Sequence, residues 1–324
     1  MNILLESIEK ADTIAIAGHL RPDGDCIGSC MGLYSYIAEN YPQKRATVYL
    51  TEYPEVFNYL KAEEAFEECC SSVKGEAYDL FVSLDCGDAD RLEEVADIMK
   101  LAKHVINIDH HITNTKFGNE NHVVPDASST SQILYTLMEE DKIGYTTACA
   151  LYTGIVHDTG VFKHSNTSSE TMRIAGKLMD KGVPFGKIID GSFYMKTYKQ
   201  LQIMGRCLLE SVRIMDGRCI FSVLRQNILD LYNAQSSDLD GIIDEMRTTE
   251  GIEVAILLTE REPQEYKVSM RSNEFIDVST IACYFGGGGH VHAAGCTIKG
   301  DAFDVVNNLT QHIEKQFIRI GQSA

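Results

Sequence analysis

The sequence lacks any apolar run long enough to cross a membrane, and its amino terminus lacks a basic stretch ahead of an apolar one. A membrane-spanning helix needs about 20 consecutive apolar residues, and a secretory signal needs that basic-then-apolar order. We therefore expect a cytoplasmic protein with no membrane partner. A disulfide framework is also missing, because most of the ten cysteines lie inside apolar or helical patterns. Cys26 with Cys30, or Cys69 with Cys70, could form half of a zinc site, but no matching His or Cys pair completes it.

Basic residues are scarce, with 29 lysines and arginines against 47 acidic residues and a net charge of −18. A protein that binds duplex nucleic acid needs a basic face to neutralise phosphates, and this sequence shows none. No long duplex nucleic acid is therefore expected as a partner. An anionic substrate would have to be neutralised locally, which favours a small ligand.

The length of 324 residues exceeds the size at which one hydrophobic core usually stops growing, so two domains are expected. Strands and helices alternate over residues 1–185, which predicts an α/β domain with a doubly wound, mostly parallel sheet. Residues 186–211 read as a helical linker with few turn residues. Residues 212–324 read as a smaller α+β domain, because Asp216-Gly217 between two apolar segments is a strong two-residue hairpin signal.

Apolar periodicity and turn residues indicate the individual elements. Strands are predicted at residues 13–17, 46–50, 78–84, 104–108, 212–215, 218–224, 254–259 and 266–270, the last two as a second antiparallel pair. Helices are predicted at residues 26–39, 63–70, 128–140, 147–157 and 239–249, with a helix or helix pair within 186–210. A further helix is predicted to begin with a capping box formed by Thr167 and Glu170.

Acidic residues and histidines follow the predicted strands and helices at four places. They are His19, Asp23 and Asp25 after the first strand, Asp85 after the third, Asp109-His110-His111 after the fourth, and Asp158 at a helix end. Because open α/β sheets bind ligands at the carboxyl ends of their strands, these side chains are expected to converge on two metal ions. Gly24 and Gly28 would let the helix start approach a ligand. The alternative is that Asp25 is a helix N-cap and Asp23 a turn residue behind Pro22.

The Asp109-His110-His111 triplet supplies one carboxylate and two imidazoles. Neighbouring residues of an extended chain point to opposite sides, so His110 and His111 are expected to have different roles. One would bind a metal ion and the other would face the substrate. Carboxylates together with histidines form an oxygen and nitrogen donor set suited to Mn²⁺ or Mg²⁺, and the histidines favour manganese.

Four consecutive glycines, residues 286–289, stand near the carboxyl end of the chain. Ordering such a run costs conformational entropy, so it indicates either a disordered linker or a loop whose backbone N–H groups bind an anion. The apolar segment before the run, together with His290 and Ala293-Ala294 after it, favours the anion-binding loop.

Together these motifs resemble those of the DHH phosphoesterases that carry a DHHA1 domain. The resemblance rests on five motifs in the same order over nearly the whole chain: Gly18-His19-x-x-Pro22-Asp23-Gly24-Asp25, Asp85, Asp109-His110-His111, Asp158-Thr159-Gly160 and Gly287-Gly288-Gly289-His290. Within that superfamily, the chain looks most similar to short bacterial enzymes that act as nanoRNases and as phosphatases on 3′-phosphoadenosine 5′-phosphate.

The resemblance implies a site with two Mn²⁺ ions, for which Mg²⁺ or Co²⁺ could substitute. The implied ligands are His19 and Asp23 for one ion, Asp25, His110 and Asp158 for the other, and Asp85 as a bridge. The implied catalytic residues are Asp85, Asp109 as the carboxylate that orients a histidine, His111 as a contact to the phosphoryl group, and Arg271. The implied contacts to substrate phosphates in the second domain are Arg271, Gly287, Gly288, Gly289 and His290. Arg21 is given no role.

The implied activity is hydrolysis of short single-stranded oligoribonucleotides to mononucleotides from the 5′ end, and conversion of 3′-phosphoadenosine 5′-phosphate to AMP. A linear dinucleotide or cyclic di-AMP phosphodiesterase is the alternative enzyme, and a nucleotide-binding sensor without turnover is the non-enzyme alternative. A family II pyrophosphatase would share the first-domain motifs, but the glycine run argues against it. The resemblance is also compatible with a homodimer.

Overall fold

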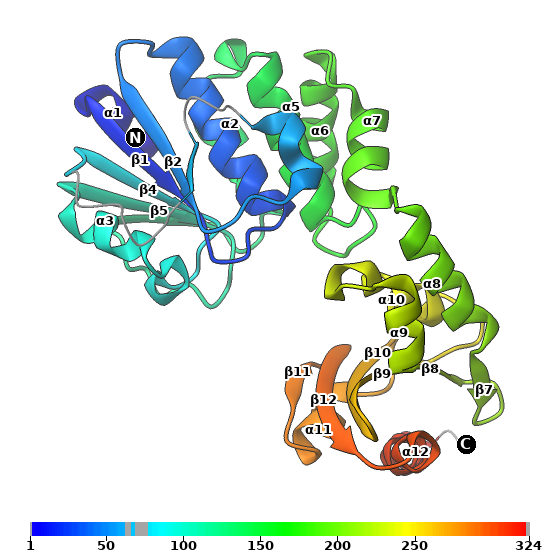
Figure 1. Ribbon diagram of the computed structural model, residues 1–324. Helices are drawn as coiled ribbons and strands as arrows, with labels where there is room; N and C mark the ends of the chain where they lie inside the picture. Colours follow the sequence, from blue (N-terminus) through cyan, green and yellow to red (C-terminus); the bar gives the residue numbers. More distant parts are fainter. Residues whose placement is uncertain (1, 62–65, 69–76, 322–324) are drawn as a thin grey trace. The chain divides into compact units, whose positions relative to one another are not determined.

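The computed structural model describes residues 2–61, 66–68 and 77–321. It divides into two compact units, Met1–Met195 and Lys196–Ala324, each of which is described by itself (Figure 1). The segment predicted as a linker, residues 186–211, is divided between them. Within the described ranges, no helix combines the length and the apolar character that a membrane crossing requires.

The first unit is built on a six-stranded sheet whose neighbouring strands all run parallel, in the order β3-β2-β1-β4-β5-β6. Its strands are β1 (Thr13–Ala17), β2 (Arg45–Leu50), β3 (Phe66–Glu68), β4 (Leu80–Leu84), β5 (His104–Asp109) and β6 (Glu120–Val123). The chain order reverses between β1 and β4, and open α/β sheets bind ligands at such a reversal. The predicted doubly wound, parallel sheet is confirmed.

Helices cover both faces of this sheet (Figure 1). They are α1 (Ile3–Lys10), α2 (Gly24–Asn40), α3 (Val95–Leu101), α4 (Thr130–Leu137), α5 (Tyr145–Asp158), α6 (Ser169–Asp180) and α7 (Phe185–Ile189). On β1, Ile14 and Ile16 belong to a core with α2 and α5, whereas Ala15 and Ala17 belong to a second core with α3. This alternation follows from the two-residue period of a strand. It explains why the buried strands are apolar throughout.

Helices α2 and α5 cross closely because glycines stand where they meet. A Cβ built on Gly28 would lie 2.6 Å from the carbonyl oxygen of Ala150 and 2.7 Å from the backbone nitrogen of Gly154. A Cβ built on Gly154 would in turn lie 2.6 Å from Asp25 Oδ1. Gly28 therefore serves helix packing, a role that the sequence did not reveal, and its predicted role in letting a ligand approach stays a prediction.

Two local predictions in this unit were wrong. Residues 66–68 form strand β3 rather than part of a helix over 63–70, because pairing with β2 outweighs local propensity. The other residues of that predicted helix lie outside the described ranges. The capping box of α6 is formed by Ser168 and Thr171, one residue later than predicted, because adjacent serine and threonine residues are equivalent caps in sequence.

The second unit contains a mixed six-stranded sheet in the order β11-β12-β10-β9-β8-β7. Its strands are β7 (Val212–Ile214), β8 (Cys219–Leu224), β9 (Val254–Glu262), β10 (Glu265–Ser272), β11 (Gly288–His290) and β12 (Ala293–Lys299). All neighbours are antiparallel except β8 and β9. Both predicted hairpins are present, but the first turns through residues 215–218 instead of two residues, because Met215, Asp216 and Gly217 all adopt positive φ.

Helices also cover both faces of the second sheet. They are α8 (Tyr198–Leu209), α9 (Gln226–Tyr232) and α10 (Ile242–Arg247) on one face, and α11 (Val278–Tyr284) and α12 (Ala302–Arg319) on the other. The helix pair predicted within 186–210 is α7 and α8, and a π-helical turn, Asp190–Tyr194, follows α7. The predicted smaller α+β domain is confirmed.

Candidate metal centre and active site

The carboxyl ends of β1, β4 and β5 bring three of the acidic motifs together. These strands are adjacent and parallel, so the residues that follow them emerge at one edge of the sheet. His19 Nε2 lies 3.5 Å from Asp85 Oδ2, and His110 Nε2 lies 3.5 Å from Asp85 Oδ1. The two carboxylate oxygens of Asp85 thus face different histidines, which makes Asp85 the centre of the cluster.

Asp85 occupies an unfavourable environment for an isolated carboxylate. Burial raises the pKa of this carboxyl well above its usual range, and the charges of Asp25 and Asp23 add to the shift. Its backbone has a φ of 55°, a left-handed conformation that costs a residue other than glycine roughly 1–3 kcal/mol. Arg21, two residues before Asp23, has the same φ of 55°. Such strain persists where the surrounding structure enforces it, which is typical of functional sites.

Asp23 begins helix α2 and faces His19. Its Oδ1 accepts hydrogen bonds from the backbone N–H groups of Asp25 and Cys26, so Asp23 is the N-cap of the helix. Its Oδ2 lies 3.9 Å from His19 Nε2. The alternative that Asp25 caps this helix is therefore wrong, and one oxygen of Asp23 remains directed toward the cluster.

Asp25 is buried between α2 and the start of α4. Its Oδ2 accepts a hydrogen bond of 2.6 Å from the N–H of Thr130, and its Oδ1 accepts one of 3.0 Å from the N–H of Ser131. Burial raises the pKa of Asp25, and the positive charge of His110 opposes that shift. Asp25 therefore fixes the amino end of α4 by hydrogen bonds. Its charge also raises the pKa of Asp85 and of Asp158.

Asp158 reaches the same edge from the last residue of α5. Its Oδ2 lies 3.7 Å from His110 Nε2 and accepts a hydrogen bond of 3.2 Å from Asn166 Nδ2. Burial raises the pKa of Asp158 to about 8, and the charges of Asp25 and Asp23 contribute in the same direction. All four predicted motifs are thus brought to one place.

His111 is oriented by a chain of polar contacts. Its Nδ1 lies 2.7 Å from Asp109 Oδ1, and Asn114 Nδ2 donates a 2.6 Å hydrogen bond to Asp109 Oδ2. The hydrogen bond that His111 donates to Asp109 raises the pKa of His111, although partial burial opposes this shift. Burial would raise the pKa of Asp109, but the hydrogen bonds from His111 and Asn114 lower it on balance. His111 is thereby favoured in its protonated form.

His110 and His111 do not point to opposite sides, contrary to the prediction from the sequence. Strand β5 ends at Asp109, so the alternation of an extended chain no longer applies to His110 and His111. Their ring centroids lie 4.7 Å apart, and His111 Nδ1 is 3.8 Å from the same Asp85 oxygen that faces His110. That geometric prediction was wrong, because it applied the alternation of a strand to residues that lie beyond the end of β5.

The chemistry of the donor set fits divalent cations. Two overlapping groups of ligating atoms share Asp85, and within each group the atoms lie within 4.8 Å of one another. The groups are His19, Cys26 and Asp85, and Asp85, His110 and His111. Burial raises the pKa of Asp25, Asp85 and Asp158 alike, so a nearby cation would favour their ionised forms.

Uncharged side chains near the centre were missed by sequence reasoning. Thr130 Oγ1 donates a hydrogen bond of 3.1 Å to Asp85 Oδ1, and Asn114 and Asn166 hold Asp109 and Asp158. The run of serine and threonine over residues 128–131 was the available signal, but it was read only as the start of a helix. Arg91 accepts a hydrogen bond from Leu20 N–H at its carbonyl oxygen, and its charge lowers the pKa of His111.

In the second unit, Arg271 and His290 lie in one row across three strands. Arg271 on β10 pairs with Ala293 on β12, and Ala293 pairs with His290 on β11. Directly paired residues share a face, so the two basic side chains project on one side of the sheet about 10 Å apart, two strand spacings. Arg271 Nε also lies 3.6 Å from Asp244 Oδ1 of α10.

The glycine run is part turn and part edge strand: Gly286 and Gly287 lie in the turn after α11, whereas Gly288 and Gly289 belong to β11, so the predicted loop is present only in its first half. Gly288 to His290 pair with β12, and a Cβ on Gly287 or Gly289 would lie 2.1 or 2.5 Å from a backbone oxygen of that strand. Close strand packing therefore accounts for two of the glycines. Gly288 meets nothing within 4 Å. A hollow of about 510 Å³ borders the run and includes Lys267 and Thr297.

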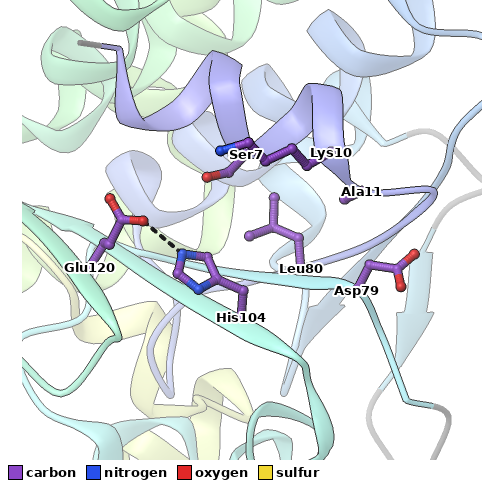
Figure 2. A pocket seen from close by; sticks show the side chains of 7 residues that line it. All are labelled: Ser7, Lys10, Ala11, Asp79, Leu80, His104 and Glu120. Atoms are coloured by element: carbon purple, nitrogen blue, oxygen red, sulfur yellow. Dashed lines mark hydrogen bonds and ion pairs between the residues drawn. The ribbon is translucent and has the colours of Figure 1, made fainter.

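A smaller hollow of about 200 Å³ lies at the opposite edge of the first sheet (Figure 2). Lys10, Asp79 and Leu80 line it, together with His104, whose Nε2 lies 3.0 Å from Glu120 Oε1. His104 begins β5, whereas the metal ligands follow the ends of the strands. This hollow is therefore separate from the candidate centre.

Comparison with known proteins places these features in a family. Residues 13–155 match the DHH family, N-terminal domain, and residues 220–318 match the DHHA1 domain. The chain is 30% identical to a Thermus thermophilus protein named bifunctional oligoribonuclease and PAP phosphatase NrnA, over 99% of this chain and 95% of that protein. It is 26% identical to the Bacillus subtilis protein of the same name, over 91% and 92%. A crystal structure of an exopolyphosphatase-related protein from Bacteroides fragilis shares the fold, with a TM-score of 0.83 and 24% identity over 96% and 94%.

The fold and the site thus define a metal-dependent phosphoesterase. The chain belongs to the DHH family, in the group whose members also carry a DHHA1 domain. It is a hydrolase, so the sensor without turnover is set aside. The DHHA1 match over residues 220–318 also agrees with the argument against a family II pyrophosphatase.

Proposed function

We propose that this protein hydrolyses short oligoribonucleotides to mononucleotides and removes the 3′-phosphate of 3′-phosphoadenosine 5′-phosphate, using two Mn²⁺ ions. The names of the T. thermophilus and B. subtilis relatives, which match over almost their whole lengths, support both substrates. The observation that carries the proposal is the position of Asp85 between His19 and His110, one at each carboxylate oxygen.

The first unit would hold the metal ions and orient the reacting phosphoryl group. The proposed ligands are His19 and Asp23 for one ion, Asp25, His110 and Asp158 for the other, and Asp85 for both. When bound, the ions supply Lewis acidity that activates water and neutralises the charge developing on the phosphoryl oxygens. His111 donates its Nδ1 proton to Asp109, which leaves the Nε2 proton to donate to a phosphoryl oxygen.

The second unit would bind a substrate phosphate on the face that carries Arg271 and His290. The edge strand β11, which contains Gly288 and Gly289, borders this face together with the preceding Gly287, and the exposed position of these glycines leaves room for an anion. Both contacts would be local, in a chain with a net charge of −18. That distribution of charge supports a substrate of a few nucleotides over a long polymer.

A substrate panel tests this proposal. Purified full-length protein is incubated with 5′-labelled RNAs of graded length, 3′-phosphoadenosine 5′-phosphate, linear dinucleotides and cyclic di-AMP, each with and without Mn²⁺. We expect Mn²⁺-dependent release of mononucleotides from the shortest RNAs and of AMP from the bisphosphate. Consumption of cyclic di-AMP alone, with the RNAs and the bisphosphate intact, would refute the proposal in favour of the cyclic dinucleotide.

A further inference from the structure

Cys26 lies beside the metal centre and has no part in the proposed function. We propose that its thiol is a sulfur ligand for a thiophilic divalent ion, such as Zn²⁺, at the position that His19 and Asp85 share. The inference rests on the metal centre of the proposed function, to which it adds a second, softer donor set. Its expected consequence is that zinc competes with manganese and inhibits the enzyme.

Three different ligating atoms meet at this point. A nitrogen of His19, a carboxylate oxygen of Asp85 and Cys26 Sγ all lie within 4.8 Å of one another. His19 Nδ1 bonds to the carbonyl oxygen of Leu20 at 2.8 Å, which leaves Nε2 as the ligating nitrogen. Each of the three side chains belongs to a residue at most 4% exposed, so little water competes for the ligating atoms.

The fold fixes the position of the sulfur. Cys26 Sγ packs against Gly18. A Cβ at residue 18 would lie only 2.1 Å from this sulfur, so glycine at this position leaves room for it. The Cys26 thiol makes a long contact of 3.9 Å to the carbonyl oxygen of His19. Losing that weak hydrogen bond would cost little free energy when the sulfur binds a metal ion. Cys30, one turn later on α2, is also buried but lies outside the cluster.

Sulfur changes which ion the centre prefers. Mn²⁺ lies at the weak end of the general affinity order for divalent ions and favours oxygen, whereas thiolates favour zinc and other softer ions. One nitrogen, one oxygen and one sulfur supply three of the four ligands of a tetrahedral zinc site. As the zinc–sulfur bond forms, the sulfur donates an electron pair and the thiol proton passes to solvent.

Cobalt titration of the metal-free, reduced, full-length protein tests the inference. Cobalt bound to a thiolate absorbs in the near ultraviolet through sulfur-to-metal charge transfer. We expect this band at the first equivalent in the wild type and in Cys30→Ser, and its loss in Cys26→Ser. Excess Mn²⁺ should suppress the band, because both ions compete for His19 and Asp85. A band retained in Cys26→Ser, or unaffected by Mn²⁺, would overturn the inference.

Zinc X-ray absorption on the wild type gives a readout that does not depend on how a variant folds. One sulfur neighbour at about 2.3 Å is expected, and nitrogen and oxygen neighbours alone would overturn the inference. The inhibitory concentration of Zn²⁺ should rise at least about tenfold in Cys26→Ser, since even an outer-shell partner is worth 10–100-fold. Mn²⁺-supported hydrolysis is measured on the same preparations. A sulfur signal without hydrolysis contradicts the proposed function alone, and hydrolysis without the signal contradicts this inference alone.

Discussion

Asp85 links the two halves of the metal centre through a single side chain. Its oxygens lie 3.5 Å from His19 Nε2 and 3.5 Å from His110 Nε2, and His111 approaches the second of these oxygens as well. His111 differs from His110 in its support, because Asp109 and Asn114 orient its ring. His110 and His111 are therefore expected to have different roles, which substituting each histidine alone can distinguish.

Replacing His111 by alanine should reduce turnover by roughly 10²–10³-fold, the usual cost of losing one transition-state hydrogen-bond donor. Manganese affinity should change little, because the proposed ligands remain. His110→Ala is the matched comparison, and it should impair both manganese binding and turnover. Calorimetric titration with Mn²⁺ and steady-state kinetics measure the two quantities. Equal loss of manganese affinity in both variants would contradict this division of roles.

The charged residues of the centre could be predicted from sequence because each lies at or after the end of an apolar strand or near a helix end. Asp85, for example, follows a buried strand, and parallel strands deliver such residues to one edge. Thr130 could not be predicted, because its bond to Asp85 joins segments 45 residues apart. A single threonine in a sequence also does not by itself indicate a metal centre. The conformation of His110 and His111 was missed because it depends on where β5 ends.

At the scale of elements, the centre depends on how closely α2, α4 and α5 approach one another. Gly28 and Gly154 allow the contact between α2 and α5, and Asp25 joins α2 to the start of α4. The central strands of both sheets and the parallel arrangement of the first sheet followed from apolar periodicity, whereas the short strand β3 was predicted as a helix. The glycine contacts did not, because a helical glycine looks the same in sequence whether it faces a neighbouring helix or open space.

Gly154→Ala tests this close approach. Its Cβ would lie 1.9 Å from Ser131 Oγ and 2.6 Å from Asp25 Oδ1, so α5 or these buried side chains must shift, and overpacking of this kind costs about 1–3 kcal/mol. Manganese affinity should fall as well, because Asp25 is displaced. Gly176→Ala in α6 is the control, since nothing lies within 4 Å of its Cβ, and it should be stabilising by up to about 1 kcal/mol. Urea denaturation compares the two, and equal stability of both variants would refute this account of the packing.

At the scale of the whole molecule, buried carboxylates couple metal binding to stability. Without metal, burial raises the pKa of Asp25 and Asp85, and it raises that of Asp158 to about 8. Each folded pKa lies above its unfolded value, so the folded state binds protons more tightly. The stability from this source is full below the unfolded pKa near 4 and is lost as the pH rises through the folded values.

The melting temperature of the metal-free protein should therefore fall as the pH rises from about 5 to about 8.5. Saturating Mn²⁺ should raise the melting temperature most at the upper end of this range, because the ions stabilise ionised carboxylates. Calorimetric scans with chelator and with Mn²⁺ measure both curves. A metal-free melting temperature that rises or stays level over this range would show that the carboxylates are not coupled to folding in this way.

The central claim, that Asp85 is shared between two catalytic ions, is tested most directly by the manganese stoichiometry of the wild type and of Asp85→Asn. Asparagine keeps the shape of the side chain and removes its charge. We predict two ions per wild-type chain, at most one per chain in the variant, and a loss of RNA hydrolysis of at least about 10³-fold, because both functions of the ions depend on this carboxylate. Two tightly bound ions in Asp85→Asn, or full wild-type hydrolysis with a single ion, would contradict the claim.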